Sequence, residues 1–220
     1  MLDTDRTDEW IKRTVAQNPC RALEDGNYRT CPVRLCFPHV FEKGDPVEVG
    51  KPGFYSASLL FPRGTDLSVL KAGAADAAFG KWPKAGEMKL KSPFLDQGEQ
   101  VQYGGFESGA EYLRAVAYEQ RPRVFDTRMQ PLTDETRVYA GVWAIAIIRF
   151  FTYDKGVNRG VSTGLNGLMI VADDKQLGGG GVDPQTAFGG VQIDAEVDPA
   201  GMFSGGEDKE AAARRALFGE

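Results

Sequence analysis

Aromatic and basic side chains alternate with small apolar ones along two predicted strands, residues 111–119 and 138–153. Successive side chains of a strand point to opposite faces, so one face of each strand carries rings and guanidinium groups. Aromatic rings can stack on the bases of a single-stranded nucleic acid, while cations follow its phosphates. The candidates for stacking are Tyr112, Tyr118, Trp143, Phe151 and Tyr153.

Basic residues accompany these rings, both on the strands and in two neighbouring segments. Residues 81–91 hold four lysines against one glutamate, and residues 121–128 hold three arginines against one aspartate. Clustered cations of this kind are typical of a path for phosphates. The candidates for phosphate contact are Lys89, Lys91, Arg114, Arg121, Arg123, Arg149, Lys155 and Arg159.

Each of these patterns also has a purely structural explanation. The aromatic face of residues 138–153 would be a second core if the helix predicted over residues 65–79 covered it. Trp143 lies in mid-strand between small residues, which suits a core position as well as a stacking one. The basic segments would then be ordinary solvated surface. The sequence leaves both interpretations open.

Signals for catalysis and metal binding are weak in this sequence. His39 is the only histidine, so a catalytic triad would have to be built on it. Cys20, Cys31, Cys36 and His39 have a composition that zinc accepts, but they lack the C-x2-C pair that organises many zinc sites. The glycine run at 178–181 is not followed by the lysine of a phosphate-binding loop. We therefore predict no enzymatic activity, no metal and no cofactor.

The composition bounds the class of protein. The 220 residues are 42% hydrophobic and 26% charged, as in an ordinary globular domain with its own core. The longest uncharged apolar run, residues 138–148, is far shorter than the roughly 20 residues of a membrane helix. The first ten residues are polar and charged, unlike a secretory signal, and an odd number of cysteines suits reduced thiols. We predict a soluble cytoplasmic protein without a membrane partner.

The net charge of −5 is concentrated at the C-terminal end of the chain. Residues 194–220 carry seven acids and three bases, so the rest of the chain is close to neutral. A near-neutral body is compatible with a local basic face for a nucleic acid, because local charge matters more than the total.

Strands dominate the predicted elements. Short strands, with one helix between the early and the late ones, fit a small closed or partly open barrel, and a sandwich is the alternative. The even-numbered side chains of residues 138–153 are mostly small, which suits the interior of a tight barrel. Gly164, Asn166 and Gly167 are expected to shape a bulge or a close approach of two backbones. The predicted strands are residues 33–37, 54–61, 111–119, 121–129, 138–153 and 161–173, and the predicted helices are residues 8–18 and 65–79.

Four segments, in order, resemble a known family. They are PVRLCFPHVFE at 32–42, FYSASLLFPRGTD at 54–66, RPRVFDTRMQPLTDETRVYAG at 121–141 and FFTYDKGVNRGVSTGLNGLMIVADDKQLGGG at 150–180. The chain is similar, over about residues 32–180, to bacteriophage single-stranded DNA-binding proteins with an OB fold, a family long catalogued as a domain of unknown function. The resemblance implies a mainly β, five-stranded OB-like barrel with one helix between strands.

The same resemblance implies a protein that coats single-stranded DNA in the host cytoplasm during phage replication or recombination, without catalysis and without sequence preference. The acidic end is a candidate site for recruiting replication or recombination proteins, and the oligomeric state stays open. The predicted organisation is an N-terminal extension at 1–30, the DNA-binding domain at 31–190 and an acidic tail with a short helix at 191–220. A β-rich assembly or protein-interaction module without DNA affinity is the alternative function, and a metal-dependent nuclease that uses an acid such as Asp126 is a third.

Overall fold

The computed structural model describes residues 7–46 and 50–177 of the chain. The acidic tail predicted at 191–220 lies outside these residues, as does the last part of the domain predicted at 31–190. No helix among the described residues has the length and apolar character to cross a membrane. The helices and strands, in chain order, are α1 (Asp8–Gln17), β1 (Arg21–Ala22), η1 (Glu24–Gly26), β2 (Asn27–Arg29), β3 (Val33–His39), β4 (Tyr55–Leu60), α2 (Ser68–Lys81), η2 (Ala85–Glu87), β5 (Phe94–Asp96), η3 (Gln97–Gln100), β6 (Glu111–Ala117), β7 (Arg123–Phe125), η4 (Glu135–Arg137), β8 (Trp143–Lys155) and β9 (Asn158–Ala172).

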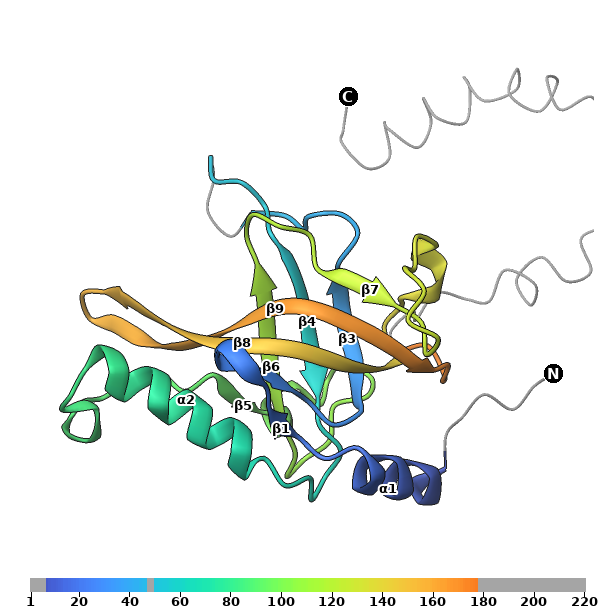
Figure 1. Ribbon diagram of the computed structural model, residues 1–220, viewed down its shortest axis with the longest axis horizontal. Helices are drawn as coiled ribbons and strands as arrows, with labels where there is room; N and C mark the ends of the chain where they lie inside the picture. The colour runs from blue at the N-terminus through green and yellow to red at the C-terminus, as the bar shows by residue number, and fades with distance from the viewer. Residues whose placement is uncertain (1–6, 47–49, 178–220) are drawn as a thin grey trace, which may run out of the picture. The chain divides into compact units, whose positions relative to one another are not determined.

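Five of these strands form a ring of hydrogen-bonded neighbours (Figure 1). Strand β3 pairs with β4, β4 with β6, β6 with β9, β9 with β8, and β8 with β3 again. The pairing of β6 with β9 is parallel and the other four are antiparallel. This is the strand order of an OB fold. The predicted mainly β, OB-like architecture is confirmed, with α2 between the second and third strands of the ring.

The ring is closed weakly at two of its five contacts, so it is not a continuous barrel. Strands β3 and β8 share two paired positions, and so do β6 and β9. By contrast, β8 and β9 pair along their whole length, from Trp143 to Lys155 on β8. They form a long hairpin, and its outer part runs past the ring as an arm (Figure 1).

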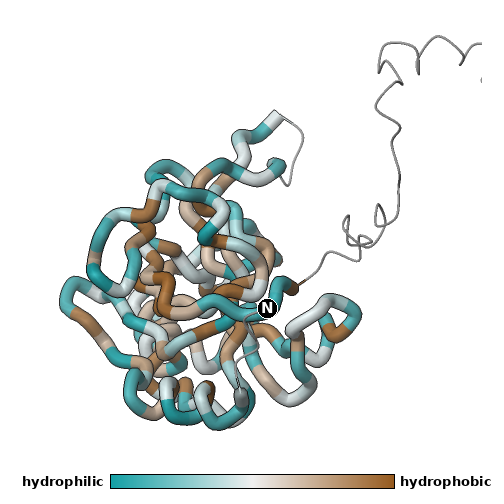
Figure 2. The backbone as a smooth tube through the Cα atoms, turned by 90° about the vertical axis from the view of Figure 1, so that its right-hand side faces the viewer, coloured by the Kyte–Doolittle hydropathy of each residue, from teal (hydrophilic) through white to brown (hydrophobic). Residues whose placement is uncertain are grey.

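Alternate side chains of the five strands fill the ring. On β8 the inward residues Ala144, Ala146 and Ile148 are fully buried, as their even-numbered positions predicted. Strand β6 contributes Leu113 and Ala115, which are also fully buried. Several apolar segments gather inside the fold and many peripheral turns are hydrophilic (Figure 2). Each large apolar side chain removed from water contributes about 1.5–3 kcal/mol to folding.

Helix α2 covers the inner side of the β8–β9 hairpin. Its small residues Ala74 and Ala78 pack with Val161 of β9 and Phe150 of β8. The helix can approach closely because Gly73 has no side chain, and a Cβ there would collide with the ring of Tyr28. The helix predicted at 65–79 is confirmed, with its first turn displaced to Ser68.

Residues 7–29, expected as an extension, build a helix and two strands against the ring. Helix α1 begins after Thr7, whose side chain accepts a hydrogen bond from the backbone N–H of Trp10 at 3.2 Å. Strands β1 and β2 pair with each other, and β2 pairs with β8 between Ile147 and Arg149. The sheet therefore continues beyond the ring on the free edge of β8.

The strand predicted over residues 138–153 starts later, at Trp143. A short 3-10 turn precedes it, and the side chain of Asp134 accepts a hydrogen bond from the Thr136 backbone at that turn, at 3.0 Å. Gly141 then has a φ of +115°, and a Cβ there would collide with the carbonyl oxygen of Lys175. Only glycine suits such a conformation and such a close contact. Strand β8 begins just beyond this bend.

Strand β9 contains the predicted bulge. Ile147 of β8 pairs with Gly167 and Ile148 pairs with Leu165, so Asn166 is the extra residue. The Nδ2 of Asn166 donates a hydrogen bond to Oδ1 of Asn27 at 2.6 Å. A Cβ on Gly167 would lie 3.1 Å from a carbonyl oxygen of β7, so two backbones also approach closely here. Both parts of the expectation are confirmed.

Candidate nucleic-acid interface

The strand pairings align outward residues from four strands. Ser56 of β4 pairs with Val116 of β6, Val116 with Gly164 of β9, and Gly164 with Arg149 of β8. Paired residues on neighbouring strands project to the same side of the sheet. The four strands therefore share one face that points away from the core, which we call the outer face. Helix α2 packs on the opposite side of the hairpin, so it does not form a second core on the outer face.

The first group on the outer face is the Phe54 cluster, which consists of Phe54, Arg114 and Tyr118. The guanidinium carbon of Arg114 lies 6.0 Å from the centre of the Phe54 ring. The Tyr118 ring lies 5.6 Å from the same ring and is 58% exposed. The sequence predicted Arg114 and Tyr118 for binding but missed Phe54, which stands just before β4. Two rings and one cation are thus available together for a base and its phosphate.

The second group is the Phe37 cluster, which consists of Phe37, Tyr103, Phe106 and Tyr112. Phe37 is 47% exposed and has a φ of +48°, at the irregularity in β3 where pairing with β4 shifts. Its ring meets that of Tyr103 at 5.3 Å, edge to face. Tyr112, predicted for stacking, lies half-buried against Phe106 at 5.3 Å, and burial raises the pKa of its phenol.

A positive φ in a bulky residue is strained, and such strain concentrates at functional positions. The sequence missed Phe37 and Tyr103. Nothing in the sequence indicates the left-handed conformation of Phe37 or the loop that brings Tyr103 beside it.

The third group lies on the arm of the β8–β9 hairpin and contains Phe151, Tyr153 and Lys155. Phe151 pairs with Ser162 and Tyr153 with Gly160, so small residues of β9 lie beside both rings. Both aromatic residues are half-buried and Lys155 is exposed. The arm thus carries rings and a cation on its outer side, as the alternation predicted.

Arg149 joins the arm to the strands of the ring. A Cβ on the paired Gly164 would lie 3.0 Å from Cγ and 3.2 Å from Nε of Arg149. The arginine side chain therefore lies across β9, over the space that a side chain at position 164 would fill. Gly164 also pairs with Val116 of β6, so between Arg149 and β6 the outer side of β9 carries no side chain at this position.

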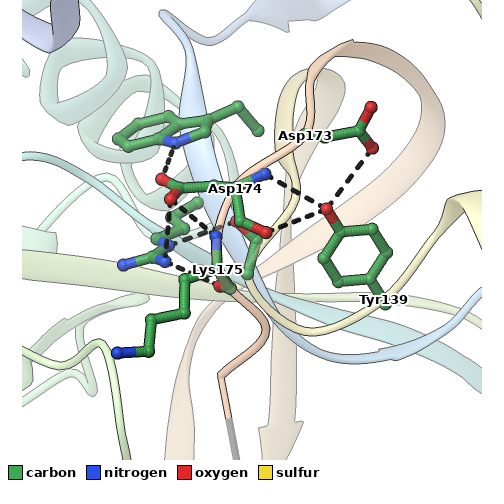
Figure 3. Close-up of polar contacts among 7 residues, drawn as sticks. Tyr139, Asp173, Asp174 and Lys175 are labelled. Carbon is green, nitrogen blue, oxygen red and sulfur yellow. Dashed lines mark hydrogen bonds and ion pairs between the residues drawn. The ribbon is translucent and has the colours of Figure 1, made fainter. Parts of the chain in front are cut away.

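Trp143 has a different environment from the other proposed stacking residues. It is 3% exposed, and its ring meets Trp10 of α1 edge to face at 5.6 Å. Its indole Nε1 donates a hydrogen bond to Oδ2 of Asp174 at 2.6 Å, and Arg34 lies 3.5 Å from the other carboxylate oxygen. The Tyr139 hydroxyl donates to the backbone carbonyl of Asp174 at 3.0 Å (Figure 3). Trp143 belongs to a structural clamp on the segment after β9, so we leave it out of the proposed interface.

The remaining predicted cations are distributed over several surfaces. Arg121 lies over the ring of Phe41, with 4.4 Å between the guanidinium carbon and the ring centre. Arg123 is exposed on β7. Arg159 points to the α2 side of the arm, where it forms a 4.0 Å ion pair with Asp154.

Lys89 and Lys91 lie in the segment between η2 and β5, beside the arm. The backbone N–H of Lys91 donates to the carbonyl of Arg159 at 3.0 Å, and Val161 donates to the carbonyl of Lys91 at 3.0 Å. Both lysine side chains are exposed. They flank the arm and do not belong to the three groups of the outer face.

The outer face is free of acidic side chains on its strands. None of the outward positions of β4, β6, β8 and β9 is Asp or Glu. Within the described residues, Arg114, Arg121, Arg123 and Arg149 have no carboxylate at ion-pair distance. Uncompensated cations beside exposed rings raise the local concentration of an anion and attract a polyanion in particular.

The residues considered for metal or catalysis do not assemble into a site in the described part of the chain. No group of three His, Cys, Asp or Glu side chains there could hold a metal ion. Cys20, Cys31 and Cys36 are buried free thiols, and burial raises the pKa of Cys36. Asp126 accepts hydrogen bonds from the backbone N–H groups of Arg128 and Gln130 at 2.8 and 2.9 Å. Asp side chains commonly stabilise turns in this way.

Comparison with known proteins bears on this face. Solved structures of the single-stranded DNA-binding protein from bacteriophage Enc34 are similar to this chain. One, in complex with single-stranded DNA, has a TM-score of 0.62 and 18% identity, and the match covers 73% of this chain and 98% of that one. Another has a TM-score of 0.59 and 20% identity, and the match covers 78% of this chain and 98% of that one. A single-stranded DNA binding protein encoded by bacteriophage T7, gp2.5, has a TM-score of 0.54 at 15% identity, over 78% of this chain and 98% of its own.

At these identities the structural likeness establishes the fold. No curated protein matches the sequence. The family described as "Enterobacter phage Enc34, ssDNA-binding protein" matches residues 27–198, which is most of the chain. The resemblance found in the sequence is thereby confirmed, and the chain belongs to the family of the Enc34 single-stranded DNA-binding protein.

Proposed function

We propose that this chain binds single-stranded DNA along the outer face of β4, β6, β9 and β8. The observation that carries the proposal is the outer face itself, where exposed arginines and partly exposed aromatic rings occur together and no outward strand position is acidic. Membership of the Enc34 family supports the choice of ligand. The role that follows is the coating of single strands during phage replication or recombination.

Binding on this face is a matter of stacking and charge. A base stacked on an aromatic side chain contributes about 1–3 kcal/mol, and every base has a π face, so such binding tolerates any sequence. The Phe54 cluster and the arm supply rings, while Arg114, Arg149 and Lys155 supply cations beside them. The strand 2–3 face and the loop between strands 4 and 5 are where OB folds hold oligonucleotides. Here these are β4–β6 and the tip of the β8–β9 arm.

The proposal includes no catalytic step. Stacking and phosphate neutralisation need neither a nucleophile nor a metal ion. We propose a binding protein and no enzyme. The acidic end at 191–220 stays a prediction as a docking site for replication or recombination proteins, and so do the domain limits at 31 and 190 and action in the host cytoplasm.

The direct test is binding of fluorescently labelled oligo-dT, followed by anisotropy at several salt concentrations without magnesium. We expect binding that weakens steeply with salt and is much weaker for a duplex. The double variant Phe54→Ala, Tyr153→Ala should bind at least about tenfold more weakly, since two stacking positions are lost. Arg137→Gln removes an exposed cation in η4, which is not a strand of the outer face; it is the control for total charge and should bind as the parent does.

Two outcomes would contradict the proposal. One is the absence of binding at low salt, which would favour the protein-interaction module. The other is equal loss of affinity in the Arg137→Gln control, because binding would then depend on total charge and not on the outer face.

A further inference from the structure

A second set of cations lies on the outward side of the sheet, along a row that runs from β1 and β2 across β8 and β9 to β7. Arg21 of β1 pairs with Arg29 of β2, Arg29 pairs with Ile147 of β8, and Ile147 pairs with Gly167 of β9. Gly167 in turn pairs with Arg123 of β7. Because paired residues project to the same side, these side chains form one row across five strands. We call it the arginine row.

The two ends of the arginine row are exposed, Arg29 within it is half-buried, and its cations are uncompensated. Arg21 and Arg123 are exposed, and Ile147 between them is 41% exposed. Within the described residues, neither Arg21, Arg29 nor Arg123 has a carboxylate at ion-pair distance. A surface that only had to be soluble would more commonly intersperse both signs of charge. A row of one sign around an exposed apolar residue favours a bound polyanion.

Arg29 shows that the like charges are crowded. Its Nη2 donates to the carbonyl of Pro19 at 3.2 Å, while its Nε is buried without a hydrogen-bond partner in the described structure. Burial, together with the neighbouring charge of Arg21, lowers the pKa of the Arg29 guanidinium. Crowded cations repel one another unless a counter-charge is near. A phosphate beside Arg21 and Arg29 would supply that charge.

The arginine row is continuous with the outer face. Arg149 stands two residues from Ile147 on β8, on the same side, and its side chain lies over Gly164 of β9. Gly164 and Gly167 place no side chain between β8 and the strands β6 and β7. Between these two glycines lies the exposed polar residue Asn166, which donates a hydrogen bond to Asn27 of β2, the residue paired with Arg149. A strand lying against Arg114 and Arg149 can therefore pass to Arg123 and Arg29 beside polar side chains, without crossing a large apolar one of β9.

We propose that single-stranded DNA bound on the outer face continues across β8 onto the arginine row, so that β1 and β2 add phosphate contacts to the site. This inference rests on the proposed function. From β9 to β1 there are three strand spacings, or about 14 Å of additional track. Arg21 lies before the first residue of the family match, which begins at residue 27. This end of the track therefore lies outside the part of the chain that the family match covers.

The test compares two double variants of the full chain. Arg21→Gln, Arg123→Gln removes the two exposed ends of the row and leaves Arg29, which also holds the Pro19 carbonyl. Arg13→Gln, Arg137→Gln removes the same charge from exposed positions of α1 and η4 and is the matched control. Binding of labelled oligo-dT is measured over a range of salt concentrations, with the thermal unfolding midpoint of each variant as the check on folding.

We expect the row variant to flatten the plot of log affinity against log salt by about 1.4, since each lost phosphate contact on a single strand removes about 0.7 from the slope. Affinity at low salt should fall about tenfold for a long oligo-dT and less for one just long enough to cover the outer face. The control should keep the parent slope.

An unchanged slope in the row variant would overturn the inference, provided that Phe54→Ala, Tyr153→Ala still loses binding. In that case the proposed function stands and the track ends at β8. If the parent chain does not bind at all, the proposed function fails and the inference fails with it. A charge-reversed version, Arg21→Glu, Arg123→Glu, should bind more weakly than the Gln version, and equal binding by the two would also count against the row.

Discussion

The two halves of β8 have the same alternating pattern and opposite surroundings. In the first half, Trp143 and Ile145 occupy the outward positions and are 3% and 6% exposed. In the second half, Arg149 is exposed, and Phe151 and Tyr153 are half-buried. Both halves place mostly apolar residues toward the core, alanines in the first half and Ile148 and Phe150 in the second. The difference therefore arises from what packs on the outward side.

The first half is covered by parts of the chain that are distant in sequence. Trp10 of α1 meets Trp143 edge to face, and Asp174, after β9, accepts the indole hydrogen bond (Figure 3). The second half has α2 on its inner side only, through Phe150 and Val161. A strand with apolar residues on both faces can thus be core on its outward side at one end and carry the proposed binding surface at the other.

The largest effect that tests the difference between the two halves of β8 is expected at Trp143. We expect Trp143→Ala to lower the free energy of unfolding by about 3–5 kcal/mol, because it empties a buried site. Tyr153→Ala on the arm should lower it by less than about 1 kcal/mol. Urea unfolding followed by circular dichroism measures both. Equal losses in the two variants would mean that the halves of β8 do not differ in burial.

Asp174 provides a second test of this difference, because its carboxylate contacts Arg34 and the buried Trp143 at the first half of β8. Asp174→Ala leaves Arg34 and the Trp143 indole without their carboxylate, and we expect a loss of about 2–3 kcal/mol in unfolding free energy. Asp173→Ala, at the exposed neighbouring position, is the control and should cost less than about 1 kcal/mol. The same urea titration measures both free energies of unfolding. An Asp174→Ala variant as stable as the parent would show that the contacts of Asp174 do not stabilise this end of β8.

Phe150 and Phe151 test the second half, since they are neighbours on opposite sides of the arm. Phe151→Ala should weaken oligo-dT binding by about 1–3 kcal/mol with little change in stability. Phe150→Ala should lower the free energy of unfolding with little change in oligo-dT binding, because the Phe150 ring packs against Tyr28 and Phe94. Anisotropy titration and urea unfolding on both variants separate the two effects. Similar behaviour in both assays would contradict the two-sided arm.

The smallest expected effect concerns the link between the arm and the ring. Gly164→Ala would push the Arg149 side chain aside, since a Cβ there lies 3.0 Å from its Cγ. A flexible side chain can move, so folding should change little, while oligo-dT affinity should fall by less than about fivefold. Gly86→Ala, where a Cβ meets no atom within 4 Å, is the control. Unchanged affinity and salt slope in Gly164→Ala would show that the position of Arg149 is unimportant.

Much of the fold could be predicted from local patterns. The β-branched and aromatic runs predicted the strands of the ring, and the spacing of Leu70 and Ala74 predicted α2. Small even-numbered residues on β8 predicted the tight interior, and the glycines around Asn166 predicted the bulge. These features depend on side chains within one element, so the sequence displays them directly.

The candidate site was only partly predictable. Arg114, Tyr118, Arg149, Phe151 and Tyr153 followed from alternation along a strand. Other members of the surface come from the irregular end of β3, from loops or from the N-terminal segment, and the tertiary fold brings them to the outer side. Those members are Phe37, Phe54, Tyr103, Arg21 and Arg29.

The sequence by itself determined which side chains share a face of each strand, which strands carry apolar residues on both faces, and which family the chain resembles. The tertiary structure alone decided which apolar face is covered. Trp143 became core because Trp10 and Asp174, far away in sequence, pack on it, whereas Tyr153 has no such cover. The physical reason is that alternation specifies the direction of a side chain from its own backbone, while burial depends on the other parts of the chain that arrive there.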